Sequence, residues 1–219
     1  MKTRYDRIAL VLLSAALAFT AVTPAAADVA SSAAAAGTVA AEKTNPTYDA
    51  ALARRVLVAQ GVLKQSQTTT TGLKKKVSRQ EFAKMLVQLS PYKDKVGTTV
   101  QTSMYSDVKR TSAYAPYIRI AVENGWMKGN LSGKFRPKQA VTLQESVAAV
   151  LAVLGYEDSD FKGSLASAKM SFYKAQKLDT NIRKKASAAM TYKDMTCLLY
   201  NMQVTADKSG TIYARSLNY

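Results

Sequence analysis

The most constraining feature of this sequence is a pattern of two helices and a glycine-rich loop that recurs along the chain. It is clearest in residues 104–154. There an apolar helix face is predicted by the i, i+1, i+4, i+5 spacing of Tyr117, Ile118, Ala121 and Val122. Ser106, Asp107 and Val108 offer an N-cap ahead of this helix, and Gly125 marks its end. Thr142, with Glu145 three residues later, has the spacing of a capping box and predicts a second helix.

Two further segments repeat this arrangement. Gly61 and Ser78 are 17 residues apart, as are Gly125 and Thr142. Ser78 and Thr191 each begin a helix with an acidic residue three positions later. An apolar stripe then follows each cap: Phe82, Met85, Leu86 and Leu89 in the first unit, Val147, Val150, Leu151 and Leu154 in the second, and Met195, Leu198, Leu199 and Met202 in the third.

These units define the expected domain organisation, with repeats at residues 46–90, 104–156 and 161–203 and a tail at 204–219. One unit has too small an apolar face to be stable alone, so the three must share a core. We therefore predict an all-α fold in which three helix–loop–helix units form a pseudo-threefold bundle. The tail either packs on this bundle or opens a longer protein.

The first 45 residues are predicted to lie outside the folded core, as a targeting signal followed by a spacer. Residues 1–27 are typical of a secretory signal peptide, with a basic start, an apolar run and a small-residue cleavage site before Asp28. The run is short and interrupted for a membrane span, so we expect a secreted protein with no membrane span after cleavage. Residues 28–45 are rich in Ala, Ser and Thr and predict a disordered spacer.

Charge and side-chain inventory restrict the class of function. The net charge is +16 and favours a polyanionic partner: wall polymer, nucleic acid or anionic membrane. The chain has no histidine and a single cysteine, Cys197, in an apolar helical run where a buried, inert thiol is expected. No zinc cluster, Ser-His pair or phosphate-binding glycine loop is present in the sequence. We predict no enzymatic activity, no cofactor and no metal site.

Residues 104–154 resemble the S-layer homology (SLH) domain. The matching positions are 105–108, Ala115, 117–118, 121–125, Gly129, 133–137 and 141–145. With its more degenerate first and third repeats, the resemblance covers about residues 46 to 203. It implies a compact unit of three consecutive repeats, with ligand grooves between neighbours, that attaches a secreted protein non-covalently to a cell-wall polysaccharide.

The resemblance also directs attention to the start of each second helix, where unpaired amides and the helix dipole favour an anion. The family typically has an arginine just after the cap that contributes to binding an acidic, commonly pyruvylated, sugar. This position is Arg79 in the first repeat, Leu143 in the second and Tyr192 in the third. Arg79 is either such a ligand contact or a solvated helix-start residue.

The repeat-two loop is the second candidate. Trp126 can stack on a sugar or belong to the core, while Lys128 and Gly129 can contact a ligand or serve the turn. The complete set of candidate ligand-binding residues is Ser78, Arg79, Trp126, Lys128, Gly129, Arg136, Thr142, Gln144 and Lys193.

The resemblance, with which the positive charge agrees, implies non-covalent anchoring to a bacterial cell wall through an anionic secondary cell-wall polysaccharide. Peptidoglycan-associated surface-layer proteins are a further partner class. The alternative is a self-assembling structural subunit of a surface layer. A nucleic-acid or membrane binder agrees with the charge, but the signal peptide and the lack of basic residues interleaved with exposed aromatics argue against it.

Overall fold

A computed structural model describes residues 48–98 and 100–217, which belong to one compact unit. The signal peptide and spacer predicted for residues 1–45 lie outside the described residues. The described part is helical, with only isolated β-bridges, so the predicted all-α class is confirmed. Its α-helices are α2 (Ala50–Ala59), α3 (Thr70–Lys74), α4 (Arg79–Gln88), α5 (Ala115–Glu123), α6 (Leu143–Val153), α7 (Leu165–Ala175) and α8 (Tyr192–Val204).

The predicted capping boxes start α4, α6 and α8. At Ser78, Thr142 and Thr191 the hydroxyl accepts the N–H of the acidic residue three positions later. That carboxylate accepts the N–H of the cap in return. Each box satisfies amides that the first helical turn leaves unpaired, a contribution of about 1 kcal/mol. The capping motif therefore places the start of each second helix correctly.

The expected N-cap at residues 106–108 is wrong. Helix α5 begins only at Ala115, and no side chain caps it. Asp107 instead binds the loop that follows α5: its carboxylate accepts the N–H of Phe135 at 2.8 Å and that of Arg136 at 2.7 Å. Asp107 is 28 and 29 residues from these two partners in the chain. Local spacing does not contain such a contact, which is why it predicted a helix cap here.

Replacing Asp107 by alanine is expected to lower the free energy of unfolding by about 2 kcal/mol, because two charge-assisted hydrogen bonds are lost. Urea unfolding followed by circular dichroism measures this change. Asp94→Ala is the matched control, since Asp94 is exposed, and should change stability by less than about 0.5 kcal/mol. Equal effects of the two substitutions would contradict the role given to Asp107.

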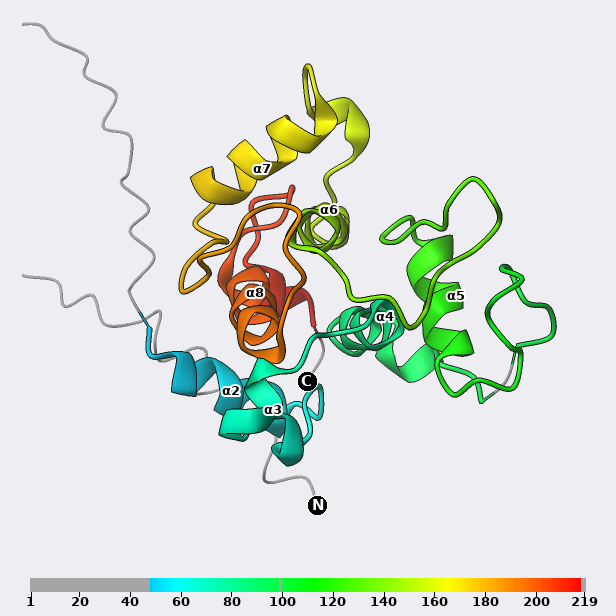
Figure 1. Cartoon of the computed structure of the whole chain (residues 1–219). Helices are drawn as coiled ribbons and strands as arrows, with labels where there is room; N and C mark the ends of the chain where they lie inside the picture. Colours follow the sequence, from blue (N-terminus) through cyan, green and yellow to red (C-terminus); the bar gives the residue numbers. More distant parts are fainter. Residues whose placement is uncertain (1–47, 99, 218–219) are drawn as a thin grey trace, which may run out of the picture. The chain divides into compact units, whose positions relative to one another are not determined.

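The apolar stripes form the core. Helices α4, α6 and α8 are seen end-on near the centre of Figure 1, with α2, α5 and α7 around them. All twelve predicted stripe residues are 3 % exposed or less. Ser146, which interrupts the second stripe, is also buried and donates its hydroxyl to Thr142 O. The predicted core faces are therefore confirmed.

The helices do not pair as simple hairpins. Helix α2 packs on α8, α5 packs on α4, and α7 packs on α6. Each outer helix thus lies against the central helix of the preceding unit, and α2 lies against that of the last. Polar contacts support the α2–α8 pairing: Tyr48 Oη donates to Asn201 Oδ1 at 2.7 Å, and Gln60 Nε2 donates to Gln203 Oε1 at 2.6 Å. The units are consequently interlocked.

The segments preceding the three capped helices meet in a ring of backbone hydrogen bonds. Val77 N–H donates to Met190 O, Met190 N–H donates to Val141 O, and Val141 N–H donates to Val77 O, at 2.8–3.0 Å. Buried amides need such partners, and here every segment supplies one donor and one acceptor. The pseudo-threefold bundle stays a prediction, which this ring favours.

The tail packs on the bundle as far as residue 217. After a bridge between Ala206 and Ile212, a 3₁₀ turn at Tyr213–Ser216 lies against α8. The buried Tyr213 hydroxyl donates to Leu89 O at 2.9 Å, just beyond the end of α4.

Of the helices in the described residues, none is long and apolar enough to cross a membrane.

Candidate functional site

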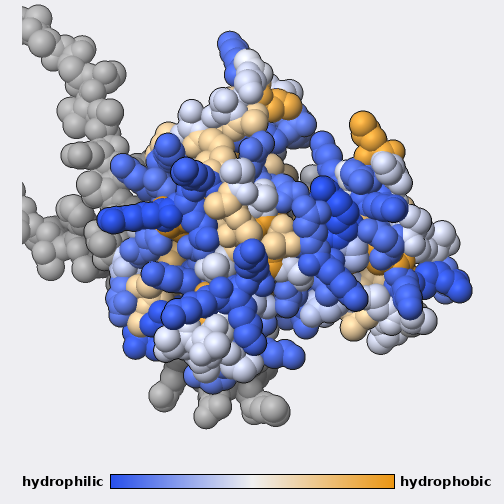
Figure 2. Space-filling model, viewed as in Figure 1, coloured by the Kyte–Doolittle hydropathy of each residue, from blue (hydrophilic) through white to orange (hydrophobic). Residues whose placement is uncertain are grey.

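A hollow lies between the start of α4, the loop after α5, helix α6 and helix α7. We call it the first groove; its volume is about 710 Å³. Figure 2 shows apolar residues gathered in the region of α6 and α7 within a largely hydrophilic face. The groove residues used below are Arg79, Trp126, Lys128, Arg136, Gln144, Glu145, Ala148, Ala152, Tyr156, Asp158 and Lys169.

Arg79 lies at one end of this groove and is only 3 % exposed. Its Nε donates to Phe135 O at 2.8 Å, Nη2 donates to Lys128 O at 2.7 Å, and Nη1 donates to Glu145 at 2.9 Å. Its guanidinium also stacks 4.8 Å from the centroid of the Phe135 ring. Burial lowers the pKa of Arg79, although Glu145 opposes this shift. Arg79 therefore joins the first unit to the second, and the expected alternative of a solvated residue is wrong.

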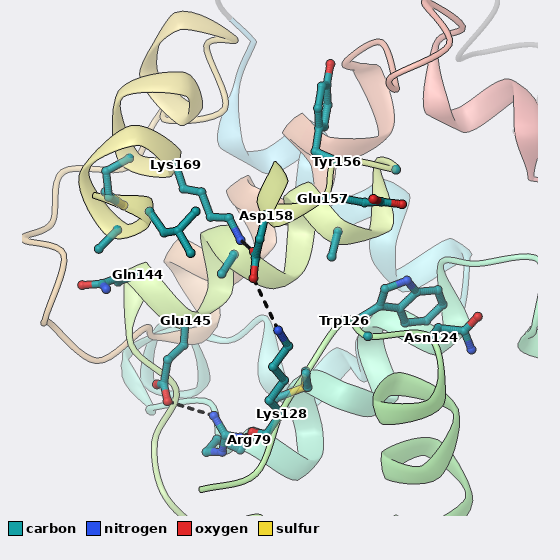
Figure 3. Close-up of a pocket in the computed structure, with 18 of the residues that line it drawn as sticks. Arg79, Asn124, Trp126, Lys128, Gln144, Glu145, Tyr156, Glu157, Asp158 and Lys169 are labelled. Atoms are coloured by element: carbon teal, nitrogen blue, oxygen red, sulfur yellow. Dashed lines mark hydrogen bonds and ion pairs between the residues drawn. The ribbon is translucent and has the colours of Figure 1, made fainter. Parts of the chain in front are cut away.

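The remaining cations of the first groove are also ion-paired. Arg136 lies 3.8 Å from the Glu145 carboxylate. Lys128 and Lys169 both pair with Asp158, reaching it from opposite sides in Figure 3. The Lys169 ammonium, by hydrogen bond and by charge, holds the pKa of Asp158 below its ordinary value. An acidic ligand in this groove must therefore compete with carboxylates already in place.

Two aromatic side chains and a small-residue wall complete the first groove. Trp126 packs edge-on against Tyr92 with ring centroids 5.7 Å apart, and Tyr156 packs against Phe172 at 4.8 Å. Both rings are half-buried and pack against the core, and both residues line the groove. Ala148 and Ala152 of α6 add an apolar wall. Such a surface suits the face of a sugar ring, whose C–H groups pack on aromatic and apolar surface.

The structure brings five of the predicted site residues together in the first groove: Arg79, Trp126, Lys128, Arg136 and Gln144. Ser78 and Thr142 serve as helix caps. Gly129 packs beneath Tyr105, whose ring a Cβ at this position would overlap, and its N–H donates to Tyr105 Oη at 2.9 Å. Lys193 lies in a different hollow.

Sequence reasoning missed Tyr156, Asp158 and Lys169. Tyr156 ends the second repeat, Asp158 follows it and Lys169 belongs to α7, and no motif spacing links them to Arg79. The interlocked packing of α7 on α6 is what brings them to the groove.

The thiol of Cys197 is buried at 1 % exposure, as predicted, and burial raises its pKa. Its position on α8 among core residues fits a packing role. Within residues 48–98 and 100–217, no group of three or more His, Cys, Asp or Glu side chains is arranged to hold a metal ion.

Comparisons with known proteins match one of the three units to a known family. The family model described as the S-layer homology domain matches residues 105–145. The second unit thus matches the S-layer homology domain, as the motif in residues 104–154 predicted. Repeats one and three stay predictions.

Two relatives of the chain have the names of bacterial surface proteins. The chain is 30% identical over 122 residues to a "Middle cell wall protein" of Brevibacillus brevis, a match that covers 55% of this chain and 12% of that protein. It is 31% identical over 118 residues to a "Surface layer protein" of Brevibacillus choshinensis, covering 53% of this chain and 11% of that protein. The chain therefore spans about a tenth of the length of these relatives. The family model and the names of the relatives point to a cell-surface or cell-wall location.

Proposed function

We propose that this protein anchors itself, or a longer polypeptide, to the bacterial cell wall by binding an anionic secondary cell-wall polysaccharide. The observation that carries the proposal is the first groove, which adjoins the S-layer homology domain and combines aromatic, apolar and charged side chains. Trp126, Lys128 and Gln144 all line this groove, so a sugar chain lying along it meets an aromatic face and polar groups. The acidic substituent expected from the family resemblance is a carboxylate, as in a pyruvylated sugar.

The groove dimensions support binding of a short stretch of polymer. A volume of about 710 Å³ lies within the range of about 300–1,000 Å³ typical of ligand sites. The ion pairs of Arg79 and Asp158 hold the walls in place before a ligand arrives. A pre-organised site avoids part of the entropy cost of binding, which favours a defined sugar unit over diffuse attraction.

Replacing Trp126 by alanine is expected to weaken retention on isolated cell walls about two- to tenfold, because aromatic ring contacts contribute about 0.5–1.5 kcal/mol. Retention is measured by co-sedimentation with purified sacculi. Tyr114→Ala is the matched control, since Tyr114 is a half-buried aromatic outside the groove. Trp126 is also the only tryptophan in the sequence, so its fluorescence reports directly on ligand entry into the first groove.

A second comparison tests the class of ligand. Walls stripped chemically of their non-peptidoglycan polymer should retain little of the mature protein, whereas untreated walls retain it. Equal retention on stripped and untreated walls would contradict the proposal. Unchanged Trp126 fluorescence on addition of the released polymer would exclude the first groove as the binding site.

The second candidate function is that of a self-assembling surface-layer subunit. One relative is named a surface layer protein, and the described surface exposes large apolar side chains at Met104 and Leu131, both flanking the first helix of the second unit. Ordered arrays formed by the mature protein in the absence of any glycan would favour this function over wall binding.

A further inference from the structure

The tail contacts the C-terminal end of each central helix. Helices α4, α6 and α8 end at the C-cap residues Leu89, Leu154 and Thr205. The carbonyl of each of these residues accepts a hydrogen bond from residues 206–217, which we call the strap. Tyr213 Oη donates to Leu89 O, Lys208 N–H donates to Leu154 O, and Tyr213 N–H donates to Thr205 O, each at 2.9 Å. One segment thus joins the ends of the three central helices.

These contacts satisfy backbone groups that a helix leaves unpaired. The last carbonyls of an α-helix have no partner within the helix, and a buried acceptor without a donor is costly. Neighbouring residues commonly supply the donor, but Tyr213 lies 124 residues from Leu89 in the chain. Tyr213 and Leu217 are 5 % and 7 % exposed and belong to the core. The strap is therefore packed as part of the bundle.

A turn within the strap fixes the position of Lys208. The Asp207 carboxylate accepts the N–H of Ser209 at 2.9 Å and that of Thr211 at 3.1 Å. Asp207 N–H in turn donates to Thr211 O at 2.8 Å. The Ser209 hydroxyl also donates to this carboxylate and lowers the pKa of Asp207. Lys208 lies between these bonded residues and is held by them.

Lys208 contacts both ends of a segment that forms one wall of the first groove. Its N–H donates to Leu154 O, and its ammonium donates to both carboxylate oxygens of Asp160 at 2.8 Å. Residues 155–158, which lie between these two contacts, all line the first groove. Among them, Asp158 pairs with lysines of two other elements (Figure 3). The strap is thus attached on both sides of this wall.

We propose that the strap controls the shape of the first groove, with Lys208 as a positioning residue for the wall at residues 155–158. While the strap is docked, Leu154 and Asp160 fix the two ends of the wall. Tyr213 and Leu217 are the only buried side chains of the strap, so it can detach in a local opening without unfolding of the bundle. The wall then loses both contacts. This coupling does not depend on a ligand; its effect on wall binding rests on the proposed function.

Amide hydrogen exchange of the mature full chain, followed by NMR, tests the coupling. The reporters are Glu157 N–H, which donates to the Asp160 carboxylate, and Asp160 N–H, which donates to Glu157 O. Tyr213→Phe removes only the hydroxyl that joins the strap to the end of α4. We expect it to speed exchange at both reporters about fivefold, equivalent to about 1 kcal/mol, the usual contribution of one hydrogen bond.

Substitutions at Lys208 test its positioning role separately. Lys208→Ala keeps the backbone N–H and removes the ammonium, and it should speed exchange at both reporters about two- to fivefold, the range expected for loss of an exposed ion pair. Lys208→Arg should keep the wild-type rate, because a guanidinium also pairs with the Asp160 carboxylate. Equal rates in the alanine and arginine variants would overturn the role given to Lys208.

Tyr117→Phe is the matched control, because Tyr117 lies on α5 and outside the first groove. It also removes one tyrosine hydroxyl, and it should leave exchange at both reporters within about twofold of wild type. Unchanged exchange at the reporters in Tyr213→Phe would overturn the proposal. An equal rise at the reporters and at the amides of α2 would show general destabilisation and would overturn it as well.

The outcome is separable from that of the proposed function. Hydrogen exchange is measured without a ligand, whereas retention is measured on purified sacculi. We expect Tyr213→Phe to weaken retention as well as to speed exchange at the wall. Faster exchange with unchanged retention would reject the first groove as the wall-binding site and leave the strap its role. Unchanged exchange in Tyr213→Phe, with normal retention of the wild type, would reject the role of the strap alone.

Discussion

Replacing Arg79 by methionine is expected to lower the free energy of unfolding by about 3 kcal/mol. The substitution preserves much of the side-chain volume but removes the partner of Glu145 and leaves the carbonyls of Lys128 and Phe135 without their donor. Breaking a buried ion pair typically costs about 3–5 kcal/mol. We place this case at the lower end, because the Glu145 side chain is 31% exposed and keeps Arg136 at 3.8 Å. Equilibrium urea unfolding measures the change.

Arg119→Met is the matched control for this prediction. Arg119 forms an exposed i, i+4 pair with Glu123, with side chains 45% and 51% exposed. Exposed pairs contribute about 0.2–1 kcal/mol, so this variant should stay within about 0.5 kcal/mol of wild type. Similar losses in the two variants would show that Arg79 does not join the units.

The prediction also changes how a binding assay at Arg79 must be interpreted. Because the guanidinium donates to three groups of the protein itself, Arg79→Ala would weaken wall retention through loss of the groove wall even without direct ligand contact. Retention of an Arg79 variant is informative only under conditions where its folded fraction has been measured. Gln144 and Trp126 are cleaner probes, since neither holds two units together by an ion pair.

Removing residues 157–219 is expected to abolish cooperative folding of what remains. The truncated chain would keep α2 without α8 and α6 without α7, which are the packing partners the structure gives them. It would also lose the partner of the Val77 amide in the ring of backbone hydrogen bonds. Thermal unfolding by circular dichroism and the dispersion of amide resonances measure the effect. If each helix–loop–helix unit folded on its own, the truncated chain would still show a sharp thermal unfolding transition, and this result would contradict the prediction.

A complementation experiment is the control for the truncation. Supplying residues 157–219 as a separate chain should restore amide dispersion if the loss arises from missing packing partners.

A point substitution gives a graded version of the same test: Leu57→Ala in α2 removes a fully buried side chain and should lower the free energy of unfolding by about 2–5 kcal/mol. Its unfolding should remain a single transition, because α2 and α8 belong to one core.

The elements whose causes are local were predictable from the sequence. The boxes at Ser78, Thr142 and Thr191 depend on residues three positions apart, and each starts a helix at the expected place. The apolar stripes depend on helical periodicity, and all of them are buried. The predicted N-cap at residues 106–108 was wrong, because Asp107 accepts a hydrogen bond from a loop residue 28 positions away. Local spacing cannot contain such a contact.

The candidate site divides in the same way. Arg79, Trp126, Lys128, Arg136 and Gln144 were found from motif positions and do share one groove. Their ion pairs could not be predicted from the sequence, because pairing with Glu145 and Asp158 depends on which units are neighbours in space. The sequence alone also offered no reason to join Lys208 to Leu154 or Asp160, which lie in and just after the second repeat.

The sequence by itself therefore determined the helical class, the capped starts, the buried faces and the net positive charge. The first three follow from hydrogen bonds and periodicity within about ten residues of the chain, and the net charge follows from composition. Only the tertiary structure decided which helix packs on which, and so which cations pair with carboxylates. Electrostatic pairing falls off within several ångströms, so the character of the first groove depends on the order in which the units interlock.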